Sequence, residues 1–76
     1  MRAEFLGKDP NSKSGGSPAA YATNRADRRT YLIQGWRITD GEALADVGHV
    51  PDHEGINEVP VEVLRLVAVR EGWITD

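Results

Sequence analysis

TYLIQGWRI, residues 30–38, is the clearest strand in the sequence, because β-branched and aromatic side chains dominate it. Alternation places its side chains on two faces: Leu32, Gln34 and Trp36 on one, Tyr31, Ile33 and Arg37 on the other. Glycine inside a strand marks a bulge or a close approach of another backbone segment. Gly35 therefore predicts one of these two features in the middle of the run.

Extended segments and turns precede this strand. AAYATN, residues 19–24, favours a second strand with Tyr21 on one face, and RAEFLG, residues 2–7, is too short for a helix. Residues 8–18, KDPNSKSGGSP, hold two prolines, two adjacent glycines, three serines and an asparagine. That composition is typical of a flexible loop. ADRRT, residues 26–30, predicts a polar turn.

Capping signals after the central strand predict a short helix. Thr39 or Asp40 suits the N-cap, Glu42 lies in the first turn and Gly48 suits the stop. The next segment, residues 56–69, is ambiguous, because alternating valines favour a strand while Pro60 and a helical apolar spacing favour a helix. We predict a short strand at 56–59 and then a helix at about 61–70, ending near Gly72. The apolar positions on the expected helix face are Val61, Leu64, Val67 and Ala68.

These elements predict a single small α+β domain over residues 1–76. Its sheet is a small, curled antiparallel β meander of three to four strands, joined by a short connecting helix and covered on one face by a C-terminal helix. The side chains expected to point inward are Phe5, Leu6, Tyr21, Leu32, Trp36, Leu44, Val59, Leu64 and Val67. A chain of 76 residues buries only about 60–65% of its unfolded surface, so its stability is marginal.

The absence of cysteine removes disulfides and thiolate zinc sites as sources of stability. Small domains without such staples often gain stability from a partner or from self-association, so a homo-oligomer is one expectation. No apolar leader segment is visible at the N-terminus, and the longest apolar run, residues 63–69, is interrupted by Arg65. We therefore expect a cytoplasmic protein that does not interact with a membrane.

The net charge of −3 is unevenly distributed. Residues 1–37 carry seven basic against three acidic residues, a balance of +4, whereas residues 38–76 carry two basic against nine acidic residues, a balance of −7. Such a polarity is either a solvated surface or a basic and an acidic binding face. The candidate residues for binding a protein partner are Asp46, Asp52, Glu54 and Glu58, with Trp73 as an exposed anchor.

A nucleic-acid interface is the alternative. The basic residues that would form it are Arg25, Arg28, Arg29 and Arg37, with tyrosine and tryptophan side chains of the sheet as stacking surfaces. The nine acidic residues downstream would repel a phosphate backbone, which weighs against this alternative.

Both histidines lie in GHVPDHEG, residues 48–55. His49 and His53 are four residues apart, a spacing that can bind one metal ion on a helix, but Pro51 between them breaks a helix. We interpret the stretch as a polar turn. No nucleophile–base pair and no phosphate-binding glycine motif is recognisable, so we expect no enzyme activity, no cofactor and no metal.

Four stretches of the chain carry a resemblance to known proteins: EFLGKDPNSKSGGSPAAYAT, TYLIQGWRITD, GEAL and EVPVEVLRLV. Their order resembles a layout that recurs in small actinomycete proteins, without an assigned biochemistry, that accompany Xre-type helix-turn-helix regulators. It is more distantly similar to the BldB-like developmental proteins. The resemblance implies a cytoplasmic accessory of transcription regulation that acts through protein contact, with a helix-turn-helix regulator as its partner.

Overall fold

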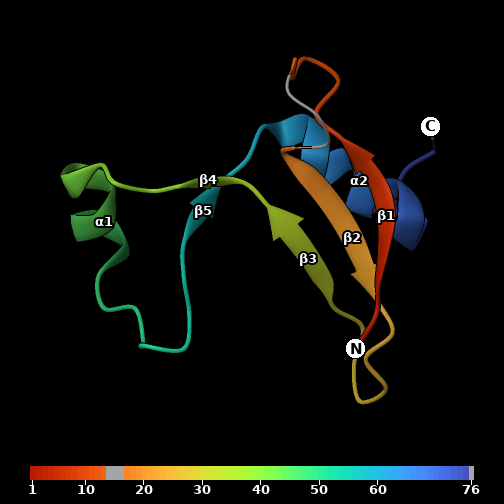
Figure 1. Ribbon diagram of the computed structural model, residues 1–76, viewed down its shortest axis with the longest axis horizontal. Coiled ribbons are helices and arrows are strands. Elements are labelled where there is room, and N and C mark those ends of the chain that lie inside the picture. The colour runs from red at the N-terminus through yellow and green to blue at the C-terminus, as the bar shows by residue number, and fades with distance from the viewer. Residues whose placement is uncertain (14–16, 76) are drawn as a thin grey trace.

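A computed structural model describes residues 1–13 and 17–75, so residues 14–16 of the predicted 8–18 loop lie outside the described part. The chain is α+β, as predicted, with an antiparallel sheet and a C-terminal helix (Figure 1). Its elements in chain order are β1 (Ala3–Lys8), β2 (Ala19–Thr23), β3 (Tyr31–Gln34), β4 (Trp36–Arg37), α1 (Gly41–Val47), β5 (Asn57–Glu58) and α2 (Val61–Glu71).

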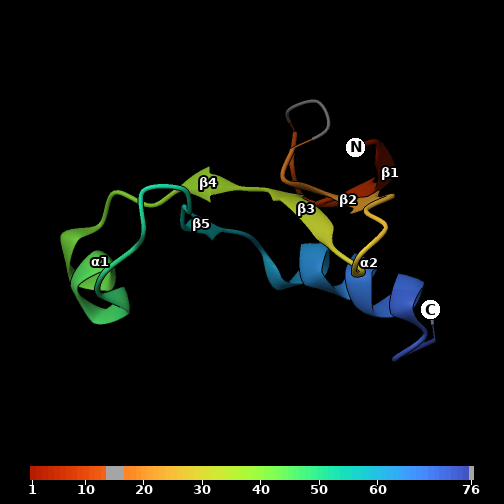
Figure 2. The same ribbon diagram turned by 90° about the horizontal axis from the view of Figure 1, so that it is seen from below.

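The first three strands form an antiparallel meander in the order β1-β2-β3. Register places Phe5, Tyr21 and Leu32 in one row across the strands. Helix α2 packs on the opposite face of this sheet (Figure 2). Gly7 allows the approach there, because a Cβ at this position would lie 3.0 Å from Cδ2 of Leu66.

The core between sheet and helix is small and consists of alanines and one valine. Its buried apolar residues are Ala20, Ala22 and Val63; Ala19 is buried as well, but alternation along β2 places it on the face that carries Tyr21. Alanine side chains let a helix approach a sheet closely, and Val63 is the fully buried contact from α2.

Five residues predicted to point inward are exposed instead. Phe5, Leu32, Trp36, Leu44 and Leu64 are exposed by 54%, 42%, 51%, 38% and 51%. For Phe5 and Leu32 the reason is that α2 covers the other face of the sheet. For Leu64 the helix phase was wrong: α2 turns Val63 inward, and Val61 is 72% exposed. Leu6, Tyr21, Val59 and Val67 are half-buried.

The ends of both helices were predicted correctly. Asp40 caps α1, with its Oδ1 accepting a hydrogen bond from the backbone N–H of Glu42 at 3.2 Å, and Gly48 ends the helix at φ 85°. Pro60 precedes the first turn of α2, and Gly72 closes it in the left-handed conformation at φ 80°. The expected short strand before α2 is also present, as β5.

The predicted single strand at 30–38 is wrong, because it divides at Gly35 between two sheets. β3 belongs to the meander, whereas β4 pairs with β5 through Trp36↔Glu58 and Arg37↔Asn57. The close approach expected at Gly35 is confirmed: a Cβ there would lie 2.4 Å from Cγ1 of Val59 and 2.6 Å from the carbonyl oxygen of Glu58.

The division at Gly35 separates the molecule into two parts. We call residues 36–58, which contain β4, α1 and β5, the arm, and the remaining described residues the body. Figures 1 and 2 show the arm projecting away from the sheet and α2, with α1 at its far end. The principal extents of the molecule are 35 × 34 × 23 Å. Within the described residues no helix is long and apolar enough to cross a membrane.

Candidate functional site

The arm contains all four acidic residues that were predicted to bind a partner. Asp46 is on α1, Asp52 and Glu54 are in the turn that follows, and Glu58 is on β5, all four exposed. Trp73, the fifth candidate, is also exposed but follows α2 at the opposite end of the molecule (Figure 1). The structure therefore brings the four carboxylates onto one projecting unit and leaves Trp73 apart from them.

The charge of the arm is strongly negative. One arginine, Arg37, stands against six carboxylates, which gives the arm a net charge of −5: Asp40, Glu42, Asp46, Asp52, Glu54 and Glu58. Because the whole chain carries −3, the rest of the sequence carries +2. Negative charge is thus denser in the arm, −5 over 23 residues, than in residues 38–76 as a whole, −7 over 39 residues.

The arm also exposes apolar side chains beside its carboxylates. Trp36 and Val47 are each 51% exposed, and Leu44 and Ile56 are 38% and 37% exposed. All seven residues of α1 are at least partly exposed. Exposed apolar side chains mark a surface that contacts another macromolecule when they gather into a contiguous patch.

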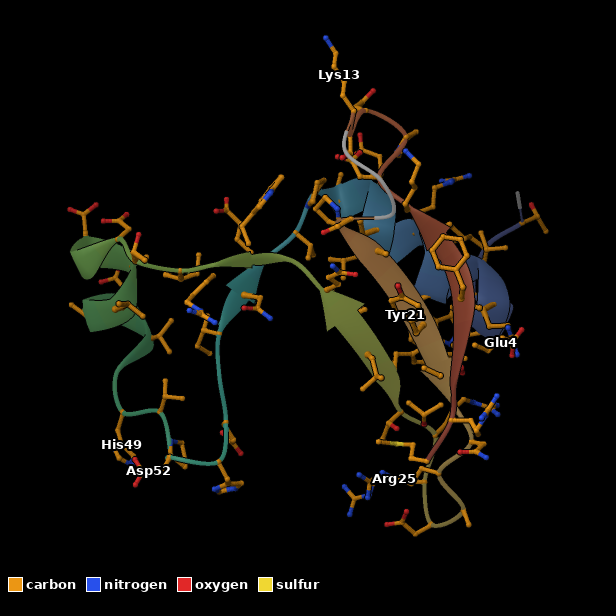
Figure 3. The ribbon with its side chains drawn as sticks, viewed as in Figure 1. Glu4, Lys13, Tyr21, Arg25, His49 and Asp52 are labelled. Carbon is orange, nitrogen blue, oxygen red and sulfur yellow. The ribbon has the colours of Figure 1, made fainter. Side chains whose placement is uncertain are left out.

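The histidine segment is a turn between α1 and β5 of the arm, as predicted (Figure 3). The backbone N–H of Glu54 donates to the carbonyl oxygen of Pro51 at 2.9 Å and closes this turn. His53 Nε2 lies 3.7 Å from Glu54 Oε2, and both side chains are largely exposed. Among residues 1–13 and 17–75, no three histidine, aspartate or glutamate side chains gather closely enough to hold a metal ion.

Three of the four arginines predicted for nucleic-acid binding share the loop between β2 and β3. Each of them has an acidic partner: Arg25 and Arg28 lie 3.7 and 3.8 Å from Asp27, and Arg29 Nε lies 2.9 Å from Glu71 Oε2. Arg37 is on β4 in the arm and does not join this loop. The loop is therefore basic but partly neutralised by Asp27 within it and by Glu71 of α2.

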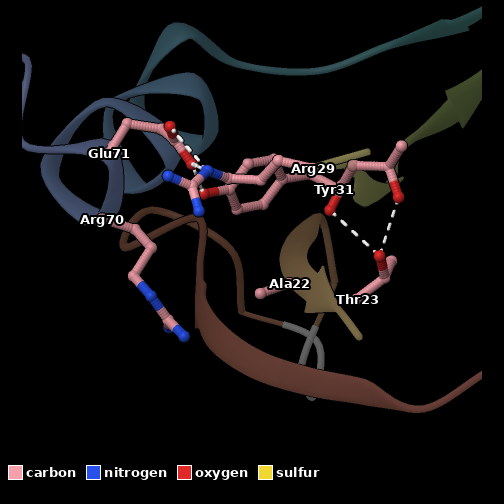
Figure 4. A pocket seen from close by; sticks show the side chains of 7 residues that line it. Ala22, Thr23, Arg29, Tyr31, Arg70 and Glu71 are labelled. Atoms are coloured by element: carbon pink, nitrogen blue, oxygen red, sulfur yellow. Dashed lines mark hydrogen bonds and ion pairs between the residues drawn. The ribbon is translucent and has the colours of Figure 1, made fainter. Parts of the chain in front are cut away.

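A small pocket of about 150 Å³ lies between this loop and the end of α2 (Figure 4). Glu71, whose side chain is 13% exposed, accepts hydrogen bonds there from the hydroxyl of Tyr31 and, at 3.1 Å, from Nε of Arg29. The carboxylate holds the phenolic proton and raises the pKa of Tyr31. Thr23 and Thr30 share a hydroxyl hydrogen bond of 2.7 Å on the other side of the pocket.

A second ion pair ties the end of α2 to β1. Arg70 donates two hydrogen bonds to the carboxylate of Glu4, at 2.7 and 3.0 Å, and this arginine lowers the pKa of Glu4. The pairs of Glu71 and Arg70 join residues 40 to 66 positions apart, so no local pattern in the sequence could have revealed them. Since the carboxylates are already paired with donors, we interpret the pocket as a brace for α2.

The face of the meander opposite α2 is an apolar surface that the sequence analysis missed. We call the row formed by Phe5, Tyr21 and Leu32 the open face. The rings of Phe5 and Tyr21 meet edge to face, with centroids 5.5 Å apart. Period-two alternation grouped Leu32 with Gln34 and Trp36, but it could not show which face of the sheet α2 would cover.

Comparisons of the chain with protein-family models, with curated proteins and with solved structures give no match in any of the three.

Proposed function

We propose that the chain is a non-enzymatic regulatory module that binds a protein partner, and that this partner is a cytoplasmic helix-turn-helix transcription regulator. The observation that carries the proposal is the acidic arm, a projecting unit of net charge −5 with apolar side chains exposed among its carboxylates. The class of partner comes from the resemblance to small proteins that accompany Xre-type regulators.

Electrostatics explains how such an arm would choose this partner. The DNA-facing surface of a helix-turn-helix domain is basic, because it neutralises phosphates. Complementary charge accelerates the encounter and orients the two proteins. The exposed apolar side chains of Trp36 and Val47 would then supply the contact area that charge alone does not.

The test is a binding titration between the full chain and a purified Xre-type regulator encoded by a neighbouring gene. We expect binding that weakens as salt is raised. Asp52→Asn with Glu54→Gln neutralises the turn between α1 and β5 and should raise the dissociation constant of the complex about tenfold. An effect of this size is typical of the loss of charge pairs at an interface. The matched control neutralises two exposed or half-exposed carboxylates of the body, Asp27→Asn and Glu62→Gln, and should bind like the natural chain.

Two results would contradict the proposal. One is failure of the regulator to bind at low salt. The other is equal weakening by the arm variant and the control variant, which would show that net charge alone matters.

Nucleic-acid binding is the second candidate, and one observation favours it: Arg25, Arg28 and Arg29 share a single exposed loop. Salt-dependent binding of a DNA or RNA duplex that is lost in Arg25→Gln with Arg28→Gln would promote this candidate over a protein partner. The ion pairs of these arginines with Asp27 and Glu71 reduce the positive charge available to phosphates.

A further inference from the structure

We infer that two copies of the chain associate as a reciprocal dimer, in which the arm of each copy packs on the open face of the other. The inference concerns the chain alone; because both contacts would use Trp36 and Val47, a regulator would have to displace the second copy from the arm. It rests on four observations: an excess of exposed surface, an apolar sheet face, an arm without a core, and complementary charges on the two surfaces.

The chain exposes more surface than a compact protein of its mass. Its accessible surface is 5963 Å², whereas a compact monomer of 8.3 kDa exposes roughly 4,600 Å². Its radius of gyration is 13.8 Å, against about 11.4 Å for a compact chain of this length. The excess surface, about 1,400 Å², exceeds the roughly 800 Å² that each partner buries in a standard stable interface.

The open face is a docking platform of rigid aromatic and aliphatic groups. Phe5 and Leu32 are 54% and 42% exposed, and Tyr21 lies between them on the central strand. The edge-to-face contact between Phe5 and Tyr21 holds the two rings in place, so little side-chain freedom is lost when a partner covers them.

The arm has too little internal contact to be stable by itself. A two-residue ribbon and a seven-residue helix are both shorter than the lengths that persist alone in water. Covering Trp36, Leu44, Val47 and Ile56 would provide the missing apolar contacts. The arm therefore needs a surface outside itself.

The body of the same copy is not within reach of the arm. At the junction, the backbone of Gly35 lies against Val59 and the carbonyl of Glu58, at distances that leave no space for a Cβ. This packing fixes the direction in which the arm leaves β3, and Figure 2 shows that direction leading away from the sheet. An arm that points away from its own body can reach the body of a second copy, as in an exchange of equivalent elements.

Charge selects a second copy as the occupant. The arm carries −5 and the rest of the chain +2, so the arm of one copy is attracted to the body of another. Arg25 lies in the loop at one end of the sheet that carries Tyr21 (Figure 3), and Arg28 belongs to the same loop. A two-fold dimer makes this acidic-to-basic contact twice.

Light scattering during size-exclusion chromatography of the full chain tests the inference. We expect a dimer of about 16.6 kDa, twice the chain mass. Two paired substitutions, Phe5→Gln with Leu32→Gln on the open face and Trp36→Gln with Val47→Gln on the arm, should each raise the dissociation constant at least roughly tenfold. The control, Val61→Gln with Leu64→Gln, changes two exposed apolar residues of α2 and should remain dimeric.

Mixing separates a reciprocal dimer from any other association. When the open-face variant is mixed with the arm variant, the intact arm of the first can pack on the intact open face of the second. The mixture should therefore form heterodimers, although neither variant alone forms a homodimer. Because the natural chain has no cysteine, a bis-maleimide should join Leu32→Cys to Val47→Cys in a mixture, and should not join Val61→Cys to Val47→Cys.

A monomeric natural chain at 100 µM, about a hundred times a micromolar dissociation constant, would overturn the inference. So would a dimer that survives both paired substitutions or dissociates in the α2 control, or a mixture without heterodimers. Circular dichroism of each variant is the control that tests whether the variant is folded. None of these measurements uses a regulator, so failure of the dimer and failure of the proposed function are distinguishable.

Discussion

The body and the arm are held by different kinds of contact. In the body, α2 packs on strands that are far from it in the sequence, and side-chain pairs connect Tyr31 with Glu71 and Glu4 with Arg70. In the arm, apart from the short pairing of β4 with β5, the hydrogen bonds are local: the Asp40 cap, the Gly48 stop and the turn between Pro51 and Glu54. The comparison teaches that local order and stability are separate properties. The arm is locally ordered by its cap and turn, but it gains little stability from burial because its apolar residues remain exposed.

The largest effect should follow a charge placed in the core of the body. Val63→Asp puts an unpaired carboxylate at a fully buried position and should cost more than about 3 kcal/mol, enough to unfold a domain this small. Urea unfolding followed by circular dichroism measures the loss. The control is Val61→Asp on the same helix at a 72% exposed position, which should change stability by no more than about 0.5 kcal/mol. Equal losses would mean that Val63 is not the core contact.

A smaller effect should separate the arm from the body. Gly35→Ala introduces a Cβ against the backbone of Glu58 and should cost about 2 kcal/mol through overpacking at the junction. Hydrogen exchange should then become faster across residues 36–58, while α2 keeps its protection. Gly55→Ala has open space around its Cβ and should leave exchange unchanged. Uniform acceleration over the whole chain would show that arm and body unfold as one unit.

Removing the phenol that pairs with Glu71 should weaken the body by about 1 kcal/mol, since Tyr31→Phe deletes a hydrogen bond to a carboxylate at a partly exposed site. The pKa of Tyr31 is raised in the folded state, so its contribution is fully present below the ordinary value of 10.0 and is lost as pH rises through the folded-state pKa. Stability curves of the natural chain and the variant should therefore converge above pH 10.

Tyr21→Phe is the matched substitution, on a hydroxyl that faces Gln34 rather than a carboxylate. It should leave the alkaline part of the curve unchanged. If the stability of the natural chain and that of Tyr31→Phe changed with pH in the same way above pH 10, the pairing of Tyr31 with Glu71 would be contradicted.

The smallest effect should be confined to the arm. Asp40→Ala removes the cap of α1 and should cost that helix about 1 kcal/mol locally, with little change in the unfolding midpoint of the body. Carbon chemical shifts of residues 41–47 report the helix population directly. Thr39→Ala, next to the cap, is the control and should keep the helical shifts. A fall in the unfolding midpoint equal to that of Tyr31→Phe would show that the arm supports the body.

Local determinants explain which parts of the fold were predictable. Asp40, Gly48, Pro60 and Gly72 act within one helical turn of their own positions, and the helix ends predicted from them are confirmed. Gly35 correctly indicated a close approach. Its neighbours did not reveal that the strand divides there, because β4 pairs with β5, some twenty residues further along the chain.

The core and the surfaces depend on contacts that no local pattern encodes. Both faces of the meander offer apolar residues, and the path of α2 decides that Ala20 and Ala22 are buried while Phe5 and Leu32 are exposed. The acidic partner-binding candidates were chosen for their charge, and the structure places four of them on one unit. Their use in binding remains a prediction.

The contact between Gly35 and Val59 has a consequence for the architecture of the chain. Because the backbone leaves β3 and returns toward α2 at nearly the same point, the 23 residues between them form an excursion with adjacent ends. A tight turn in place of residues 36–58 would connect β3 directly to α2 and leave the paths of the meander and of α2 unchanged. The excursion can therefore be lengthened, shortened or replaced at little entropic cost, as an insertion carried by an independent scaffold.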